Sequence, residues 1–288
     1  MTADLETLVV AGYVFACELG GPRGRGRPPK TTDEELIALS VAQAAMGICS
    51  DPQFLGIVDK VLPGWFAHLP SQSQYNRRLR ALTPKLVWVQ QRLSGLLATG
   101  TLRIADGTLV GVANYAGCAQ LSEFAGLAAY GYCPSKSRYY WGLRLVLLTD
   151  RLGLPVGYTL VPANEKEYEP VRELARGDRS QLLVCDKGLW GRQYAETLRL
   201  EGILIRTPDR RRTADNAERE RGLARIRLVV ESTIANLKCQ MRLEHHLAKT
   251  PSGLVQRIAQ RLLALTLGML LNALIGRPPR SLVAYDGR

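Results

Sequence analysis

Three acidic residues in apolar surroundings constrain this chain more than any other feature. Asp106 interrupts the apolar, β-branched run LRIADGTLVGV, Asp186 ends the run QLLVCDKG, and Glu231 lies in the helical pattern RIRLVVESTIANLK. An unpaired carboxylate in a buried strand costs more free energy than strand propensity supplies. We therefore expect a metal ion or a basic neighbour at each acid. Oxygen ligands of this kind suit Mg²⁺ or Mn²⁺ better than zinc, which points to phosphoryl transfer.

Length and charge set the class of protein. The chain has 288 residues, 46% of them hydrophobic, which is enough for one large or two small domains with cores of their own. Its formal net charge of +12 favours a polyanionic partner. Charge alone does not distinguish such a protein from one that is merely basic.

The cysteines, histidines and apolar runs argue against a zinc-binding, secreted or membrane-spanning protein. The six cysteines and three histidines have no zinc-ligand spacing, so we expect reduced thiols and no structural zinc. The N-terminus carries acidic residues where a secretory signal needs basic ones. The apolar run from Leu262 to Gly276 has 15 residues, fewer than the roughly 20 that span a bilayer. A cytoplasmic protein with a C-terminal core helix is expected, without membrane contact.

Four segments follow from the pattern along the chain. Residues 1–30 contain a short helix and a basic arm, and residues 31–98 contain helices bounded by proline or glycine, the first with Thr32 as its N-cap. Strand-like runs alternate with helical ones over residues 99–276, in the order βββαβαβα, and residues 277–288 form a tail. The sequence thus predicts an α/β (α+β) domain preceded by an all-α region.

Sequence blocks around the acids resemble a known family. IADGTLV, CDKGL, RLVVESTIANLK and the long block YYWGLRLVLLTDRLGLPVGYTLVPANEKE are similar to bacterial insertion-sequence transposases of the DDE class, most closely the insertion sequence 982 group. The resemblance covers nearly the whole chain. It implies a ribonuclease H-like catalytic domain and an N-terminal helical region that binds DNA.

The resemblance also implies a chemistry. Asp106, Asp186 and Glu231 would be the catalytic acids and the ligands of two Mg²⁺ or Mn²⁺ ions. They would cleave double-stranded DNA at transposon terminal repeats and join the 3′-hydroxyl to target DNA. The family further implies a homo-oligomer on DNA in a bacterial nucleoid. A catalytically inactive DNA-binding repressor or domesticated descendant, and a plain metal-dependent nuclease, are the alternatives.

Two cations accompany Glu231. In the family's Tyr-Arg-Glu-Lys signature an arginine precedes the glutamate by four residues and a lysine follows it by seven; here these are Arg227 and Lys238, while Ala224 stands at the tyrosine position. Both cations fall on the helix face of Glu231 and are candidate catalytic residues. The plainer interpretation is a pair of solvated cations.

Other residues are candidate DNA contacts. The Arg-Gly-Arg-Pro core of the basic arm resembles an AT-hook, or is only a linker. An arginine-rich segment, 206–227, leads into the helix of Glu231 and suits phosphate contact. A tryptophan just after Asp186 either stacks on a base or simply packs. The candidates are Arg25, Arg27, Lys30, Arg77, Arg78, Arg210, Arg211, Arg212 and Trp190.

Three further acids, Glu123, Glu165 and Glu167, could compete as metal ligands. Glu167 stands at the start of a predicted helix, a setting that favours solvation and N-terminal capping over metal ligation.

Overall fold

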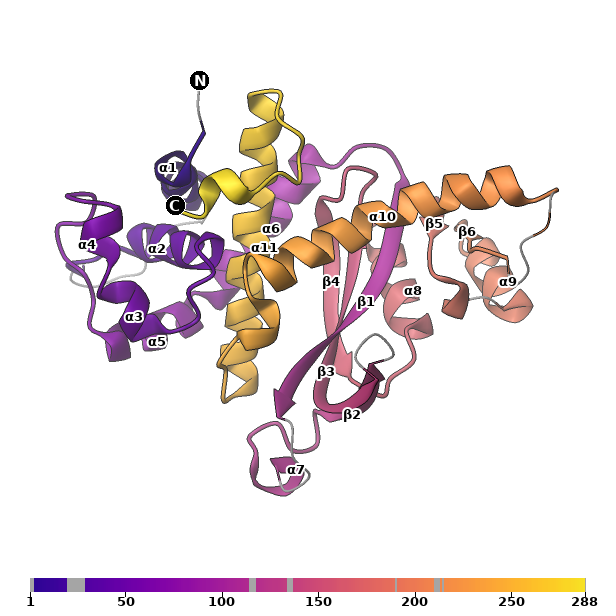
Figure 1. Ribbon diagram of the computed structural model, residues 1–288, viewed down its shortest axis with the longest axis horizontal. Helices are drawn as coiled ribbons and strands as arrows, with labels where there is room; N and C mark the ends of the chain where they lie inside the picture. Colours follow the sequence, from indigo (N-terminus) through magenta and orange to yellow (C-terminus); the bar gives the residue numbers. More distant parts are fainter. Residues whose placement is uncertain are drawn as a thin grey trace. The chain divides into compact units, whose positions relative to one another are not determined.

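The computed structural model describes residues 3–19, 29–113, 118–133, 137–189, 191–209, 213 and 215–287. Tertiary contacts divide the chain into two compact units. The first unit joins Met1–Leu97 to Ala235–Arg288, and the second is Ala98–Ile234. Figure 1 labels the helices and strands of both units.

Helices build the first unit throughout its described part (Figure 1). α11 packs against α2 and α6, and α1 packs against α2. Two 3-10 turns, Leu243–His245 and Val283–Tyr285, complete the C-terminal part. The helices are α1 (Leu5–Leu19), α2 (Asp33–Ala45), α3 (Asp51–Leu55), α4 (Val58–Val61), α5 (Gln72–Ala81), α6 (Thr83–Leu97) and α11 (Pro251–Leu274).

The start of α2 follows from its local sequence. The Thr32 hydroxyl accepts a hydrogen bond from the Glu35 backbone N–H at 3.1 Å, and the Glu35 carboxylate accepts one from the Thr32 N–H at 2.5 Å. This reciprocal pair satisfies two backbone donors that a helix start leaves open. The predicted N-cap at Thr32 is confirmed.

α11 is the core helix of the first unit, and it is longer than the apolar run predicts. Arg257 and Arg261 are buried in its first half. Arg257 is paired with Asp51, and Arg261 donates to the Met241 carbonyl at 2.7 Å. Length and composition alone would let α11 cross a membrane, but 94% of its most apolar window is buried inside the protein. This is the pattern of a core helix in a globular unit.

A mixed six-stranded sheet forms the centre of the second unit (Figure 1). Its order is β2-β3-β1-β5-β6, with β4 also paired to β3. β1, β2 and β4 each pair antiparallel with β3, whereas β5 pairs parallel with β1, and β6 pairs parallel with β5. The strands are β1 (Leu102–Ala113), β2 (Ala129–Cys133), β3 (Arg138–Thr149), β4 (Pro155–Pro162), β5 (Leu182–Val184) and β6 (Leu204–Arg206).

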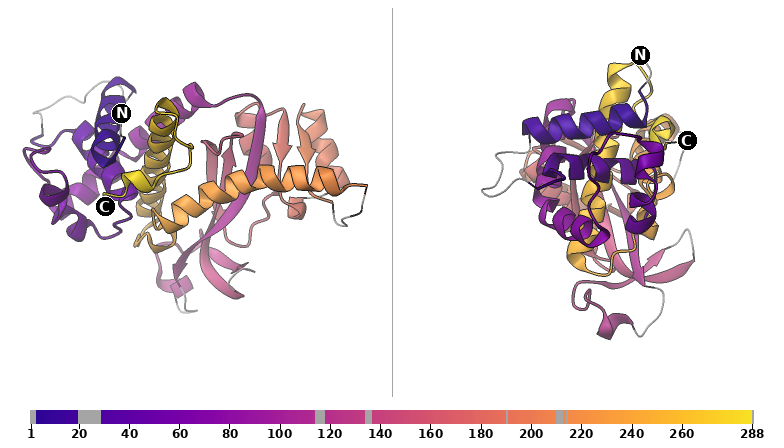
Figure 2. Two further views of the ribbon diagram at one scale, coloured as in Figure 1. Left: turned by 45° about the horizontal axis from the view of Figure 1, so that its top comes forward. Right: turned by 90° about the vertical axis from the view of Figure 1, so that its left-hand side faces the viewer.

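Helices lie on both faces of this sheet, as Figures 1 and 2 show. Val171 and Ala175 of α8 and Leu198 of α9 pack on one face in a single apolar cluster with Ala105 and Cys185. α10 crosses the other face (Figure 2). The helices of this unit are α7 (Cys118–Leu121), α8 (Tyr168–Gly177), α9 (Arg192–Leu200) and the greater part of α10 (Ala217–Cys239), with a 3-10 turn at Lys187–Leu189.

One strand was not expected. β2 has the sequence AYGYC, and its central Gly131 weakens any strand signal in the sequence. A Cβ on Gly131 would lie 2.6 Å from the Ala163 carbonyl oxygen, so only glycine fits there. The residues Arg151, Leu152 and Gly153 between two strand-like runs predict a hairpin. β3 and β4 form this hairpin, with Gly153 at a φ of 90° in its turn.

The two units differ from the predicted segments in one respect. The predicted start of the α/β domain at residue 99 lies beside the division at Ala98, but α11 groups with the N-terminal helices rather than with the sheet. Periodicity shows that a helix is buried, not which partner covers it. The segments of the sequence analysis therefore stay a prediction.

Candidate active site

Strand register brings Asp106 and Asp186 to neighbouring positions. β1 and β5 pair in parallel from Leu102↔Leu182 to Ile104↔Val184, an offset of 80 residues that also separates the two aspartates. Asp186 follows β5 by two residues. The preceding residue in each case faces the cluster under α8, so each aspartate points to the opposite face, where α10 lies.

α10 adds the third acid and a cation between them. Nη2 of Arg227 lies 3.1 Å from Oδ1 of Asp186 and 3.3 Å from Oε1 of Glu231, one helical turn away. The two carboxylate side chains are 44% and 45% exposed, whereas that of Arg227 is 24% exposed. One guanidinium therefore joins the sheet acid to the helix acid.

Asp106 is the most enclosed of the three. The pKa of Asp106 is raised to about 6: burial raises it most, the nearby charges of Glu167 and Glu231 also raise it, and the Gly107 backbone N–H and Arg227 lower it. The Gly107 N–H donates to Oδ1 of Asp106 at 2.9 Å. Asp106 thus lies within electrostatic reach of the helix acid and its cation.

A fourth acid, Glu167, lies near Asp106, against Gly107 on the α8 face of the sheet. The Glu167 side chain, 18% exposed, forms an ion pair with Arg144, and Arg144 also donates to the Ala163 carbonyl at 3.2 Å. A Cβ at Gly107 would lie 2.4 Å from Oε1 of Glu167, so a larger residue there would displace this carboxylate. Glu167 occupies the N-cap position of α8 but makes no side-chain cap. The expectation of a solvated capping residue is wrong, because the basic side chain that pairs with Glu167 comes from a distant strand.

Two buried polar atoms near these acids have no hydrogen-bond partner among the residues that the structure describes. They are the Thr108 hydroxyl and Nε of Arg144. Thr108 follows Asp106 by two residues on β1 and so points to the same face of the sheet. Across the described part of the chain, no three His, Cys, Asp or Glu side chains are grouped closely enough to form a complete metal site.

The remaining candidates have different surroundings. Lys238 lies two turns beyond Glu231 on α10 and pairs with Glu244 at 3.3 Å. Arg78 donates to the Thr31 carbonyl at 2.6 Å and to Asp33 at 2.5 Å, which fixes α5 against the start of α2.

Exposure separates the other DNA candidates. Lys30 and Arg77 are exposed. Six more lie outside the described residues: Arg25, Arg27, Trp190, Arg210, Arg211 and Arg212.

Comparison with known families decides the class of this protein. The family described as "Transposase DDE domain" matches residues 98–267. The chain belongs to the DDE transposase family. Members of this family cleave DNA and transfer strands, and the matched range of this transposase contains Asp106, Asp186, Glu231, Arg227 and Lys238.

Other comparisons add little about this transposase. No curated protein matches the chain. Among solved structures, the cryo-EM structure of the piggyBac transposase synaptic complex with hairpin DNA is similar over 96% of this chain and 74% of that one, with 11% identity and a TM-score of 0.49. A likeness this weak supports no conclusion about fold or function.

Proposed function

We propose that this transposase cuts DNA at the ends of a mobile element and joins the freed 3′-hydroxyl to target DNA, with Asp106, Asp186 and Glu231 as catalytic carboxylates. One observation carries the proposal. The guanidinium of Arg227 contacts two of these acids, and its charge also acts on the third. Acids that are 80 and 45 residues apart in the sequence converge on one cation inside the range matched by the family.

The donor chemistry of this centre fits a divalent cation. All three acids offer oxygen, which Mg²⁺ and Mn²⁺ prefer, and the unpartnered Thr108 hydroxyl adds an oxygen on the same face. Asp106, Asp186 and Glu231 would hold the metal. Bound ions would supply activation of the attacking hydroxyl and stabilisation of the leaving oxygen.

Protein cations have roles of their own in this proposal. Arg227 balances the charge of Asp186 and Glu231 and keeps both side chains oriented toward one point. When DNA is bound, the guanidinium of Arg227 is suited to donate hydrogen bonds to a phosphate oxygen near the reacting bond. Lys238 is the second catalytic cation that the family resemblance implies, and it forms an ion pair with Glu244 at 3.3 Å.

We infer a ribonuclease H-like fold for the sheet unit and a relationship to the bacterial insertion sequence 982 group. Support for the fold comes from antiparallel β4, β3 and β1 followed by parallel β5 and β6. The acids also stand on the first strand, after β5 and on the helix after β6. The blocks around Asp106, Asp186 and Glu231 support the group.

Duplex DNA is the proposed partner, at both the terminal repeats and the target, with the protein acting as a homo-oligomer. The net charge of +12 supports a polyanion. For the basic arm, we expect that Arg25→Ala with Arg27→Ala weakens binding chiefly to A·T-rich duplexes. Equal loss of affinity on A·T-rich and G·C-rich duplexes would reduce the arm to an electrostatic tether.

A strand-transfer assay tests the proposal. Purified full-length protein is incubated with Mg²⁺, a labelled end-containing duplex and a supercoiled target plasmid, and both cleaved ends and joined products are quantified. A transposase gives both. Cleavage without joining would identify a plain nuclease, and binding without cleavage an inactive DNA-binding protein; either result would contradict the proposal.

A further inference from the structure

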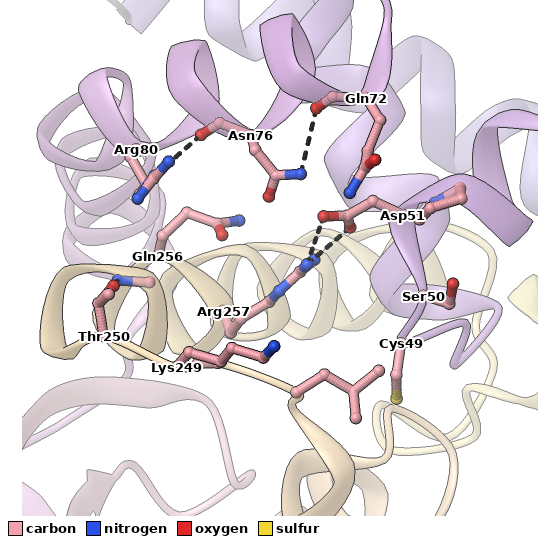
Figure 3. Close-up of a pocket in the computed structure, with 14 residues that line it drawn as sticks. Cys49, Ser50, Asp51, Gln72, Asn76, Arg80, Lys249, Thr250, Gln256 and Arg257 are labelled. Carbon is pink, nitrogen blue, oxygen red and sulfur yellow. Dashed lines mark hydrogen bonds and ion pairs between the residues drawn. The ribbon is translucent and has the colours of Figure 1, made fainter. Parts of the chain in front are cut away.

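A polar pocket of about 370 Å³ lies inside the helical unit (Figure 3). α5 forms one wall, the start of α11 forms another, and the residues just before and within α3 close a third side. In Figure 3, Asn76 on α5 and Gln256 on α11 face each other across the open space. Every residue that lines the pocket belongs to the first unit.

A buried network fixes the floor of the pocket. Nη2 of Arg257 donates to both oxygens of Asp51, at 2.6 and 2.7 Å, and both residues are buried. Gln43 donates to Asp51 at 2.7 Å, and the fully buried Tyr75 hydroxyl donates to Gln43 at 3.0 Å. Because each member is held by another, the floor is rigid and close to neutral.

The rim of the pocket is cationic. Arg80 and Lys249 are exposed, and neither has an acidic partner among the described residues. Asp51 is the sole acid among the lining residues, and Arg257 already neutralises it. The lining therefore carries two uncompensated positive charges.

Neutral donors lie between these cations. Gln72, Asn76 and Arg80 succeed one another at intervals of four residues along one face of α5, with Asn76 half-buried between two exposed side chains. Asn76 donates to the Gln72 carbonyl at 3.1 Å, and Nε of Arg80 donates to the Asn76 carbonyl at 3.3 Å. Opposite them, α11 begins at its Thr250 N-cap, so the positive end of a 24-residue helix faces the same space.

We propose that this pocket binds one backbone phosphate of duplex DNA. A phosphodiester carries one negative charge and accepts hydrogen bonds from both cations and amides, which matches the donors of the pocket. The exposed rim lets a polymer pass over the pocket. This inference rests on the proposed function, since it takes DNA as the substrate, and it names a site that the catalytic acids do not define.

Replacement of single DNA phosphates by uncharged groups tests the site in the full-length protein. We compare wild type, the double variant Arg80→Gln with Lys249→Gln, and the matched control Lys60→Gln, whose side chain is exposed on α4 away from the pocket. Affinity for an end-containing duplex is measured by fluorescence anisotropy without divalent ions. In a set of duplexes, one linkage at a time is replaced by an uncharged methylphosphonate. Thermal unfolding confirms that each variant is folded, as expected for exposed side chains.

If the pocket binds one phosphate, the effect of the double variant and the effect of the methylphosphonate should be coupled at a single linkage. There the methylphosphonate weakens wild type and Lys60→Gln by about tenfold, but weakens the double variant less than about twofold. The double variant also lowers the slope of log affinity against log salt by about 0.9, the value for one phosphate. Free inorganic phosphate, titrated as a competitor, should displace the duplex less from the double variant than from wild type.

Three results would overturn the inference. The first is the absence of coupling at every linkage, and the second is coupling at two separate linkages with a slope change of about 1.8. The third is a loss of inorganic phosphate binding without coupling to any linkage, which would assign the pocket to a free anion. Because binding is measured without divalent ions, failure of this inference leaves the catalytic proposal standing, and failure of that proposal does not alter the coupling.

Discussion

Substitution of Arg227 should change the free energy of unfolding only slightly but should lower the rate of DNA cleavage strongly. Its guanidinium contacts Asp186 at 3.1 Å and Glu231 at 3.3 Å, yet both acids are nearly half exposed. Solvent-exposed ion pairs of this kind contribute about 0.2 to 1 kcal/mol each. Arg227→Ala also relieves the protein of one partly buried cation. We therefore expect the free energy of unfolding to fall by about 1 kcal/mol or less.

The rate of DNA cleavage should respond much more strongly. A cation fixed beside the point where charge develops is worth roughly 3 to 4 kcal/mol in the transition state, or about 10²- to 10³-fold in rate. Arg227→Lys keeps the charge but loses the planar guanidinium that reaches both acids, so its rate should lie between those of wild type and Arg227→Ala.

Single-turnover kinetics give the decisive comparison. Cleavage with Mg²⁺ is followed at saturating duplex, unfolding is followed in urea, and DNA affinity is measured without metal. Arg225→Ala, an exposed arginine on the same helix, is the matched control. If Arg227→Ala cleaves at the wild-type rate once DNA is saturating but binds more weakly, Arg227 is a docking contact and the reasoning is refuted.

Three further outcomes follow from the contacts described. Asp51→Asn leaves the buried Arg257 without a countercharge and should lower the free energy of unfolding by about 3 to 5 kcal/mol in urea titrations; a change below about 1 kcal/mol would contradict a buried pair. Gly107→Ala should destabilise by about 1 to 3 kcal/mol through overpacking and reduce cleavage, whereas Gly222→Ala, with open space around it, should not destabilise. Chelation with EDTA should stop cleavage while binding of the duplex persists, and cleavage that survives complete chelation would exclude a divalent metal.

The sheet and its acids were predictable because they depend on local patterns. Apolar β-branched runs marked the strand of Asp106 and the strand before Asp186, and a three-residue turn marked the hairpin of β3 and β4. The capping pair Thr32 and Glu35 needs only a spacing of three residues. β1 residues pair with β5 residues that lie 80 positions later in the sequence, and Asp186 lies 80 positions after Asp106. This pairing brings the two aspartates together.

Other features depend on partners that are distant in sequence. Glu167 pairs with Arg144 of β3, and Arg257 pairs with Asp51, 206 residues away. No periodicity encodes such pairs. The sequence alone therefore makes the half-buried Glu167 look solvated and places the buried Arg257 outside the apolar run of its helix. The pocket on α5 was missed for the same reason, since its second wall comes from α11.

The central claim is that Asp106, Asp186 and Glu231 form one metal-dependent catalytic centre. The most direct measurement compares Asp106→Asn, Asp186→Asn and Glu231→Gln with the exposed control Glu165→Gln in cleavage and strand transfer with Mg²⁺. We expect each of the three variants to lose both activities by more than about 100-fold, with DNA affinity nearly unchanged, while the control keeps both. Retained cleavage in any of the three variants would contradict the assignment of that residue.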